Sequence, residues 1–397
     1  MKKNRKLFIT DYCLTPLKKI EKSAILCQDD KILAIGGASA FVREEGLEIY
    51  DFENAYATPG FIDTHIHGAG GFDSTNAYTG REKIEDMSRI LVERGVTTFI
   101  PTVVSDESEN MLKNLAALSE MMGRKLPGAE AVGVNIEGPF INPKKSGSQE
   151  SSFIRDKIDL GFCRELLSAA NGKVKKMTFA PELEGAVELV ELLRDEGVIP
   201  SMGHSLAQEK ETLRAIDAGA RSCTHLFNGM PPLHQRRVTL TGIMLTDARV
   251  SVELIIDGRH LHPRMVDLAC RCKPFDKVIG ISDGTMGSGM PDGDYHIGPT
   301  PIKVENGFSQ NKSGLLAGTT TLLDTGWHSL MSYSHMREIN AAACVTSNAA
   351  KGLNLEDRGL LQPLKKADIA FFERGTNRPL MTVCGGKIVF KTNTNLK

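Results

Sequence analysis

Eight short apolar runs, rich in β-branched residues, recur between residues 61 and 282 of the 397-residue sequence. They lie at 61–62, 97–100, 131–136, 177–180, 198–202, 222–224, 250–256 and 278–282. Stretches with helical periodicity separate them, for example 83–94, 186–196 and 209–218. Continuously apolar strands that alternate with helices are typical of a parallel sheet covered on both faces. Eight such repeats over about 300 residues favour a closed, TIM-like (β/α)₈ barrel over an open sheet.

The two ends of the chain have a different texture. Residues 1–57 contain several short apolar runs joined by polar turns, and residues 366–397 contain similar runs. Both segments therefore predict short strands, which can pair into one small β domain assembled from the two termini. Residues 58–365 remain for the barrel.

Charge and hydropathy exclude several classes of protein. The sequence holds 48 basic and 49 acidic residues, so it lacks the basic excess of nucleic-acid-binding proteins. The sequence contains no window of 18 uninterrupted apolar residues, so no transmembrane helix is expected. Charges at Asp11, Lys18 and Lys19 interrupt the apolar stretch near the N-terminus, so no signal peptide is expected. The eight cysteines form no CxxC pair, which favours free thiols in a reducing cytoplasm.

Five of the apolar runs end in histidine or an acidic residue. Because the carboxyl ends of parallel barrel strands meet on one face, these side chains are expected to share a pocket. They are His65, His67, Glu137, His204, His225 and Asp283.

The pair His65 and His67 has a simple geometric meaning. Residues i and i+2 of a strand share a face, so both imidazoles are expected to point into the barrel. Imidazole and carboxylate ligands suit zinc, iron or a similar divalent ion. A lone His-x-His pair is weak evidence, but three further ligand-type residues at other strand ends support a metal centre.

Asp283 follows the last of the eight runs and precedes Gly284. Such an aspartate can simply cap the following segment. In a metal site it can instead take a proton from the attacking water and return it to a leaving nitrogen, because a divalent ion lowers the pKa of water from 15.7 towards about 7.

Several longer motifs narrow the interpretation. The segment 59–68 (PGFIDTHIHG) is similar to the first-strand motif of the amidohydrolase superfamily. Further motifs, in order and spacing, resemble those of the N-acetylglucosamine-6-phosphate deacetylase family. They are EGPF at 137–140, GHS at 203–205, THLFNGM at 224–230, DGRH at 257–260, SDG at 282–284 and LAGTT at 316–320. With KKAD at 365–368, the resemblance covers nearly the whole chain.

The resemblance implies a (β/α)₈ barrel with a β-sandwich from residues 1–57 and 366–397, a homodimer, and hydrolysis of the acetamide of an amino-sugar 6-phosphate. It implies that Glu137, His204 and His225 hold the metal common to the family. His65 and His67 match a second site that some members have lost, so one or two divalent ions are expected.

The remaining motif positions match groups around the reaction and the substrate. Asp283 matches a metal ligand that is also the catalytic acid/base, and His260 matches a histidine near the substrate carbonyl. Asn228 and Gly229 match a backbone phosphate site. Arg236 matches an arginine that the neighbouring subunit supplies to the phosphate, where a guanidinium pairs two oxygens at once.

Two positions depart from the family pattern. Gln149 stands where the family usually has a histidine near the acetamide, and glutamine can donate a hydrogen bond but cannot carry a positive charge. Arg237 replaces a carboxylate and adds positive charge near the expected phosphate. Both residues are expected to contact the substrate, and neither belongs to the predicted metal ligands.

Three functions therefore remain open. The first is deacetylation of an N-acetylated amino-sugar 6-phosphate, with N-acetylglucosamine 6-phosphate as the substrate. The second is a related amidohydrolase for a different N-acyl or phosphorylated compound, motivated by Gln149 and Arg237. The third is a sugar-phosphate-binding protein without catalysis, for which Asp283 would be superfluous.

Overall fold

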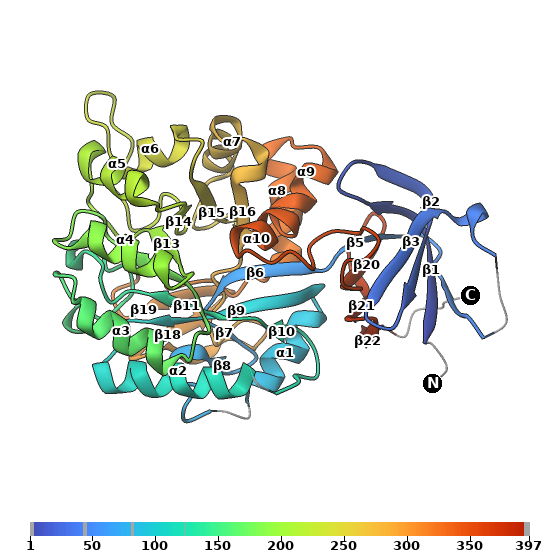
Figure 1. Cartoon of the computed structure of the whole chain (residues 1–397), viewed down its shortest axis with the longest axis horizontal. Coiled ribbons are helices and arrows are strands. Elements are labelled where there is room, and N and C mark those ends of the chain that lie inside the picture. The colour runs from blue at the N-terminus through green and yellow to red at the C-terminus, as the bar shows by residue number, and fades with distance from the viewer. Residues whose placement is uncertain (1–3, 43–45, 81–82, 123, 393–397) are drawn as a thin grey trace.

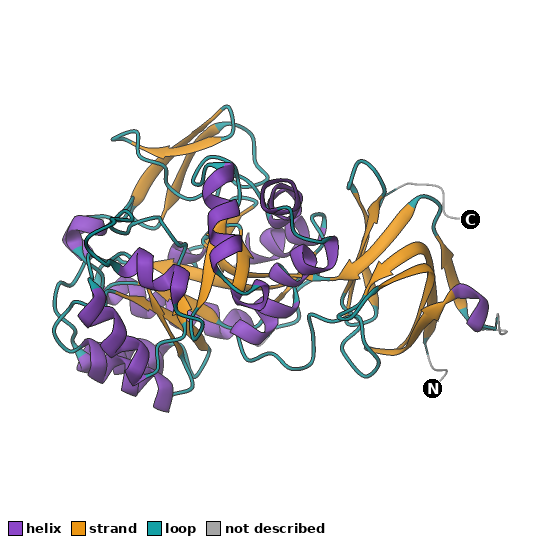
Figure 2. Cartoon of the chain, turned by 90° about the horizontal axis from the view of Figure 1, so that it is seen from above, coloured by secondary structure: helices purple, strands orange, loops and turns teal. Residues whose placement is uncertain are grey.

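The computed structural model describes residues 4–42, 46–80, 83–122 and 124–392. A barrel of parallel strands with helices around it forms the larger part of the molecule (Figure 1). A second sheet lies at one end, and both termini lie there (Figures 1 and 2).

Eight parallel strands form the barrel, and each overlaps one of the eight apolar runs. They are β6 (Phe61–Ile66), β9 (Val96–Val104), β11 (Val134–Glu137), β12 (Val174–Phe179), β13 (Ile199–Met202), β14 (Ser222–Cys223), β15 (Ser251–Ile255) and β16 (Val278–Ile281). The barrel closes between its last strand, β16, and its first, β6. At this junction the backbone N–H of Asp283 donates to the carbonyl of His65 at 2.9 Å. The predicted (β/α)₈ barrel is confirmed.

Helices connect the strands and cover the outside of the barrel. They are α1 (Ile84–Val92), α2 (Ser108–Met122), α3 (Leu160–Ala169), α4 (Ala186–Asp195), α5 (Glu209–Ala218), α6 (Leu240–Thr246), α7 (Pro263–Cys272), α8 (Leu323–Ser334), α9 (Glu338–Cys344) and α10 (Ser347–Gly352). In α1, Ile84, Met87, Ser88 and Leu91 are buried, the spacing of one helical face against the sheet. None of the described helices has the length and apolarity needed to cross a membrane.

The second sheet combines strands from both ends of the chain. Its members are β1 (Arg5–Leu14), β2 (Lys19–Gln28), β3 (Lys31–Gly37), β4 (Glu48–Asp51), β5 (Ala55–Pro59), β20 (Ile369–Glu373), β21 (Pro379–Cys384) and β22 (Lys387–Lys391). The termini meet where β20 pairs antiparallel with β5. Its core includes Phe371, whose ring centroid lies 5.1 Å from that of Phe8 and 4.7 Å from that of Phe52.

Shorter strands complete the structure. An antiparallel sheet of β17 (Gly293–Ile297), β18 (Thr300–Glu305) and β19 (Phe308–Asn311) follows β16. The two-residue strands β7 (Gly68–Ala69) and β8 (Phe72–Asp73) pair with each other, and β10 (Glu130–Ala131) pairs with β9. The β17–β19 sheet was not expected from the sequence. It places Ile297 against the pocket described next.

Candidate metal centre

The carboxyl ends of five barrel strands bring ligand-type side chains into one pocket. His65 lies in β6, and Glu137 is the last residue of β11. His204, His225 and Asp283 each lie two residues beyond the end of their strand, β13, β14 and β16. All five side chains are buried. The structure therefore brings together residues that lie more than 200 positions apart in the sequence.

The residues that follow the strands have an uncommon backbone conformation. His204, His225 and Asp283 have φ angles of +45°, +26° and +52°, a region that side chains other than glycine rarely adopt. This conformation costs on the order of 1–3 kcal/mol per residue and is found preferentially at functional sites. Their carbonyl oxygens accept backbone hydrogen bonds of 2.8–3.0 Å from their own or neighbouring loops, which hold the turns in place.

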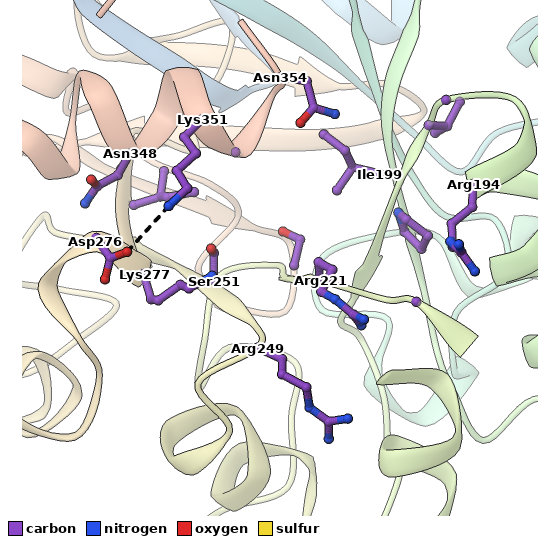
Figure 3. Close-up of a pocket in the computed structure, with 17 residues that line it drawn as sticks. Arg194, Ile199, Arg221, Arg249, Ser251, Asp276, Lys277, Asn348, Lys351 and Asn354 are labelled. Carbon is purple, nitrogen blue, oxygen red and sulfur yellow. Dashed lines mark ion pairs between the residues drawn. The ribbon is translucent and has the colours of Figure 1, made fainter. Parts of the chain in front are cut away.

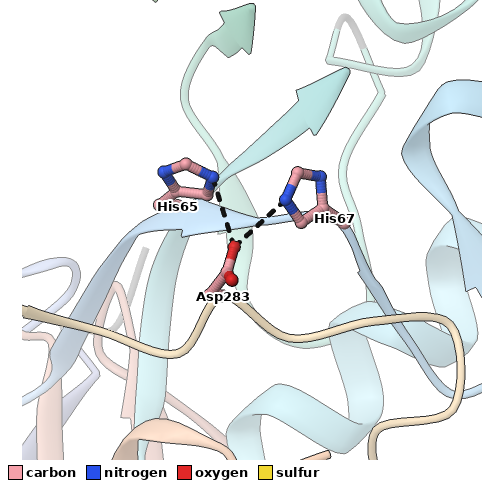
Figure 4. Close-up of side chains that lie close together, drawn as sticks. All are labelled: His65, His67 and Asp283. Atoms are coloured by element: carbon pink, nitrogen blue, oxygen red, sulfur yellow. Dashed lines mark ion pairs between the residues drawn. The ribbon is translucent and has the colours of Figure 1, made fainter. Parts of the chain in front are cut away.

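One group of ligand-type atoms comprises His65, His67 and Asp283 (Figure 4). Asp283 Oδ1 lies 3.3 Å from His65 Nε2 and 3.1 Å from His67 Nε2. Both imidazoles point towards the same carboxylate oxygen, as expected for residues i and i+2 at the end of one strand.

A second group comprises Glu137, His204 and His225. Glu137 Oε1 lies 3.1 Å from His204 Nε2 and 2.7 Å from His225 Nε2. Glu137 also faces the first group, because its Oε2 lies 3.5 Å from His67 Nε2. A single carboxylate therefore stands between two sets of imidazoles.

The charges in the pocket are strongly coupled. Burial alone would raise the pKa of Glu137, but the imidazoles of His65 and His204 hold it well below its usual range. Burial likewise opposes the charge on Asp283, yet the close contact with the His67 imidazole lowers the Asp283 pKa. For His67, burial favours the neutral ring, but the contact with Asp283 raises its pKa to about 9. The carboxylates are thus held ionised, the form that binds a metal.

The donor set fits one or two divalent ions. His65 Nε2 and Asp283 Oδ1 are buried and make no hydrogen bond with any described residue. An orphaned buried pair of this kind is costly unless another group satisfies it. In the second group, His204 Nδ1 lies 2.6 Å from the carbonyl of Lys145, which leaves Nε2 free to face Glu137. Imidazole nitrogens with carboxylate oxygens are the ligands that zinc and iron take in proteins.

Two residues behind the centre were missed by the sequence analysis. Glu253 Oε2 lies 3.3 Å from His65 Nδ1, the nitrogen that points away from the pocket. Lys176 Nζ contacts Glu253 Oε1, and Thr64 Oγ1 donates to the same oxygen at 3.0 Å. A carboxylate on the far nitrogen of a ligand histidine fixes its ring orientation and tautomer. The available signal was Glu253, a charged residue inside the otherwise apolar run 250–256, whereas Lys176 directly precedes the run 177–180.

The pocket in front of the two groups has a volume of about 210 Å³. Its lining includes four of the predicted substrate-side residues, Gln149, Asn228, Gly229 and His260. Gly229 has a φ of +63°, and a Cβ there would lie 3.0 Å from His204 Nδ1. The glycine therefore lets the backbone pass directly over a candidate ligand. His260 is oriented by Asp257, whose Oδ2 lies 2.8 Å from His260 Nδ1.

Gln149 is held in a defined orientation. Its Oε1 accepts hydrogen bonds from Ser105 N at 3.1 Å and Ser105 Oγ at 2.7 Å. Its Nε2 must then donate, and it donates to Glu137 Oε2 at 3.1 Å. Gln149 thus contacts a candidate metal ligand in addition to lining the pocket, a role that the sequence did not indicate.

Arg236 and Arg237 do not join this pocket. Both are exposed on the loop between β14 and α6, and neither lines the cavity in the described chain. Within one subunit, the structure therefore does not bring together all the predicted substrate-side residues.

Comparisons with known proteins agree with the fold. A model of the amidohydrolase family matches residues 56–276. N-acetylglucosamine-6-phosphate deacetylase of Bacillus subtilis (strain 168) is 34% identical over 393 residues, which cover 97% of each chain. The chain belongs to the N-acetylglucosamine-6-phosphate deacetylase family of amidohydrolases.

Other members of this family show the same relationship. N-acetylgalactosamine-6-phosphate deacetylase of Escherichia coli O157:H7 is 28% identical, over 87% of this chain and 92% of its own. N-acetyl-D-glucosamine-6-phosphate deacetylase from Mycobacterium smegmatis has been solved as a mutant in complex with N-acetyl-D-glucosamine-6-phosphate. That structure superposes with a TM-score of 0.91 at 26% identity, over 98% of this chain and 100% of its own. As a family member, the protein is a hydrolase acting on an amide C–N bond.

Proposed function

We propose that the protein hydrolyses the acetamide of an N-acetylated amino-sugar 6-phosphate, with N-acetylglucosamine 6-phosphate as the preferred substrate. The products are the amino-sugar phosphate and acetate. The observation that carries the proposal is the placement of Asp283 between two imidazoles of a candidate metal centre, beside a pocket lined by His260 and Gly229. The names and similarity of the relatives support the choice of substrate.

Glu137, His204 and His225 would hold one divalent ion, and His65, His67 and Asp283 would hold a second. Zinc or iron fits this set of nitrogen and oxygen ligands. When bound, such an ion polarises the amide carbonyl and lowers the pKa of water.

The protein side chains then supply proton transfer and orientation. Asp283, kept ionised by the neighbouring imidazoles, takes a proton from the attacking water and delivers it to the departing nitrogen. His260 is fixed by Asp257 through Nδ1, so its Nε2 is available to the substrate near the carbonyl. Gln149 has a second amide hydrogen for the substrate, beyond the one donated to Glu137.

The phosphate would lie against the backbone at Asn228 and Gly229. We further propose that the protein is a homodimer in which Arg236 of one subunit reaches the phosphate in the other, with Arg237 close by. The exposure of both arginines in a single chain supports this arrangement. The eight free cysteines are consistent with a cytoplasmic location.

A panel of substrates tests the proposal. Turnover is measured for N-acetylglucosamine and N-acetylgalactosamine, each with and without a 6-phosphate, and for N-propionylglucosamine 6-phosphate. We expect the acetylated 6-phosphates to be hydrolysed and the unphosphorylated sugars to fail. Preference for the galactosamine epimer or for another acyl group would favour a related amidohydrolase with a different substrate, for which Gln149 is the motivating residue.

Asp283→Asn separates catalysis from binding. The asparagine side chain can still occupy the site but is a poor base. We therefore expect at least a 100-fold loss of kcat, within the range of general-base contributions of about 10²–10⁴. Metal content, measured by elemental analysis, reports whether the centre survives. A metal-loaded Asp283→Asn protein with full turnover would refute the assignment. A fully metal-loaded wild-type protein that turns over no acylated sugar would instead indicate a sugar-phosphate-binding protein.

A further inference from the structure

A second pocket, drawn in Figure 3, lies at the amino ends of barrel strands, away from the metal centre at their carboxyl ends. It has a volume of about 350 Å³. Ile199, Ser222 and Ser251, the first residues of β13, β14 and β15, contribute to its lining. The proposed active site uses the carboxyl ends of these strands, so the two pockets occupy opposite faces of the barrel.

Cationic side chains outnumber carboxylates in the lining of this second pocket. Five of them come from five separate segments of the chain, and only one carboxylate, that of Asp276, lies among the described lining residues. The five are Arg194, Arg221, Arg249, Lys277 and Lys351. Such a concentration of charge is unexpected in a chain with a formal net charge of −1.

Carboxylates neutralise two of these cations. Arg249 is paired with Asp217 at 2.8 Å and with Asp247 at 2.6 Å. Lys351 lies 3.5 Å from Asp276, the ion pair drawn in Figure 3.

The other three cations have no carboxylate partner among the described residues. Arg194 Nη1 donates to the carbonyl of Ala218 at 2.8 Å, and Arg221 Nη1 donates to the carbonyl of Ala220 at 2.8 Å. These bonds anchor each guanidinium but leave its charge uncompensated and its other N–H donors free. Lys277 makes no ion pair within the described chain. Three positive charges therefore surround the cavity without a carboxylate partner among the residues that the structure describes.

We propose that this pocket binds a metabolite-sized anion that carries a phosphate group. A phosphate accepts several hydrogen bonds in fixed directions, and planar guanidinium groups donate pairs of them. Backbone carbonyls hold the guanidinium groups of Arg194 and Arg221 in place, so less side-chain entropy is lost when an anion binds. The hydroxyl of Ser251 and the amide of Asn354 line the same cavity and provide neutral partners for an organic portion. The concave shape fits a small molecule better than a polymer. The inference is independent of the proposed deacetylation.

The test is isothermal titration of the metal-loaded protein with inorganic phosphate and, separately, with glucose 6-phosphate. The pocket variant is Arg194→Gln/Lys277→Met. The control variant, Arg164→Gln/Lys210→Met, removes the same charge from two exposed side chains outside this pocket. Arg221 is left unchanged because it anchors two backbone carbonyls.

We expect the wild type and the control to bind one equivalent of anion that the pocket variant binds at least ten-fold more weakly. Values of kcat and KM for deacetylation should be unchanged, which separates this pocket from any anion bound at the metal centre. Binding of phosphate but not of glucose 6-phosphate would identify free phosphate as the ligand. Binding of glucose 6-phosphate but not of phosphate would identify a phosphate monoester. Equal anion stoichiometry and affinity in all three proteins would overturn the proposal. Should the double variant fold poorly, Lys277→Glu alone must weaken the same binding event.

Discussion

Replacing Lys176 by methionine would remove the one cation that contacts the Glu253 carboxylate in the described barrel interior. Both side chains are 2% exposed, and Lys176 Nζ also donates to the carbonyl of Thr64 at 2.9 Å. Loss of one partner from a buried ion pair leaves the other charge uncompensated, at a cost of about 3–5 kcal/mol. We expect the free energy of unfolding of the barrel to fall by this amount.

The expected change is large enough to measure by calorimetry. With an unfolding entropy of about 2.1 cal/mol/K per residue and a barrel of about 300 residues, the loss corresponds to roughly 5–8 °C in Tm. Metal-free protein is the sample of choice, because bound metal would add its own stabilisation.

The pH dependence gives a second signature. Burial opposes the charge on Glu253, but Lys176 brings its pKa down to about 2 in the folded protein. A folded pKa below the unfolded value contributes stability at neutral pH that is lost as the pH falls. Without Lys176, burial instead favours the protonated acid, so the deficit of the variant should shrink as the pH falls from 7 towards 4.

Two controls test the reasoning. Lys175→Met removes a cation from the same strand whose side chain is only partly buried, and we expect its Tm to match the wild type. Lys176→Met/Glu253→Gln leaves no unpaired charge and should recover part of the lost stability. A Lys176→Met protein within about 1 kcal/mol of wild type at neutral pH would contradict the argument, as would a deficit that grows on acidification.

Three further predictions concern separate parts of the molecule. Gln149→Ala removes the donor at 3.1 Å from Glu137 Oε2, and we expect a loss of about 10–100-fold in metal affinity, measured by competition with a chelator; unchanged affinity would exclude this role. If Arg236 acts across the dimer, mixing Arg236→Ala with Asp283→Asn protein should restore about a quarter of wild-type activity. Half of the dimers are then mixed, and each mixed dimer has one complete site. No recovery would place Arg236 in its own subunit. Burial lowers the pKa of Lys273 from 10.5 to about 8. The free energy of unfolding of the wild type relative to Lys273→Met, measured in urea, should therefore rise by roughly 1–3 kcal/mol between pH 8 and 10. The same pH dependence in both proteins would refute this reasoning.

Much of the fold could be predicted because its signals are local. A strand buried on both faces must be apolar along its whole length, and each of the eight apolar runs became a barrel strand. The helices at 83–94, 186–196 and 209–218 appear as α1, α4 and α5 with the expected spacing. The insertion β17–β19 was not predicted. Its strands alternate buried and exposed residues, but with four to six residues each they give only a short signal in the sequence.

The candidate site was only partly visible in the sequence. His65 and Asp283 could be recognised as ligand types at strand ends, since strand direction alone places such ends on one face. Glu253 was visible only as a charge in an apolar run, because the side of the strand on which a residue points depends on its register with neighbouring strands. Gln149 was expected at the substrate, and its bond to Glu137 depends on Ser105, which no local pattern connects to it.

The sequence by itself therefore determined the order of the strands, the types of ligand at their ends and the division between barrel and terminal strands. Only the tertiary structure decided which of these groups touch. Closure of the barrel sets β16 beside β6 and so brings Asp283 to within 3.3 Å of His65 across more than 200 residues of chain. The same closure gathers uncompensated cations at the opposite face. The physical reason is that periodicity reports how a segment is buried, whereas distances between segments arise from the packing of the whole chain.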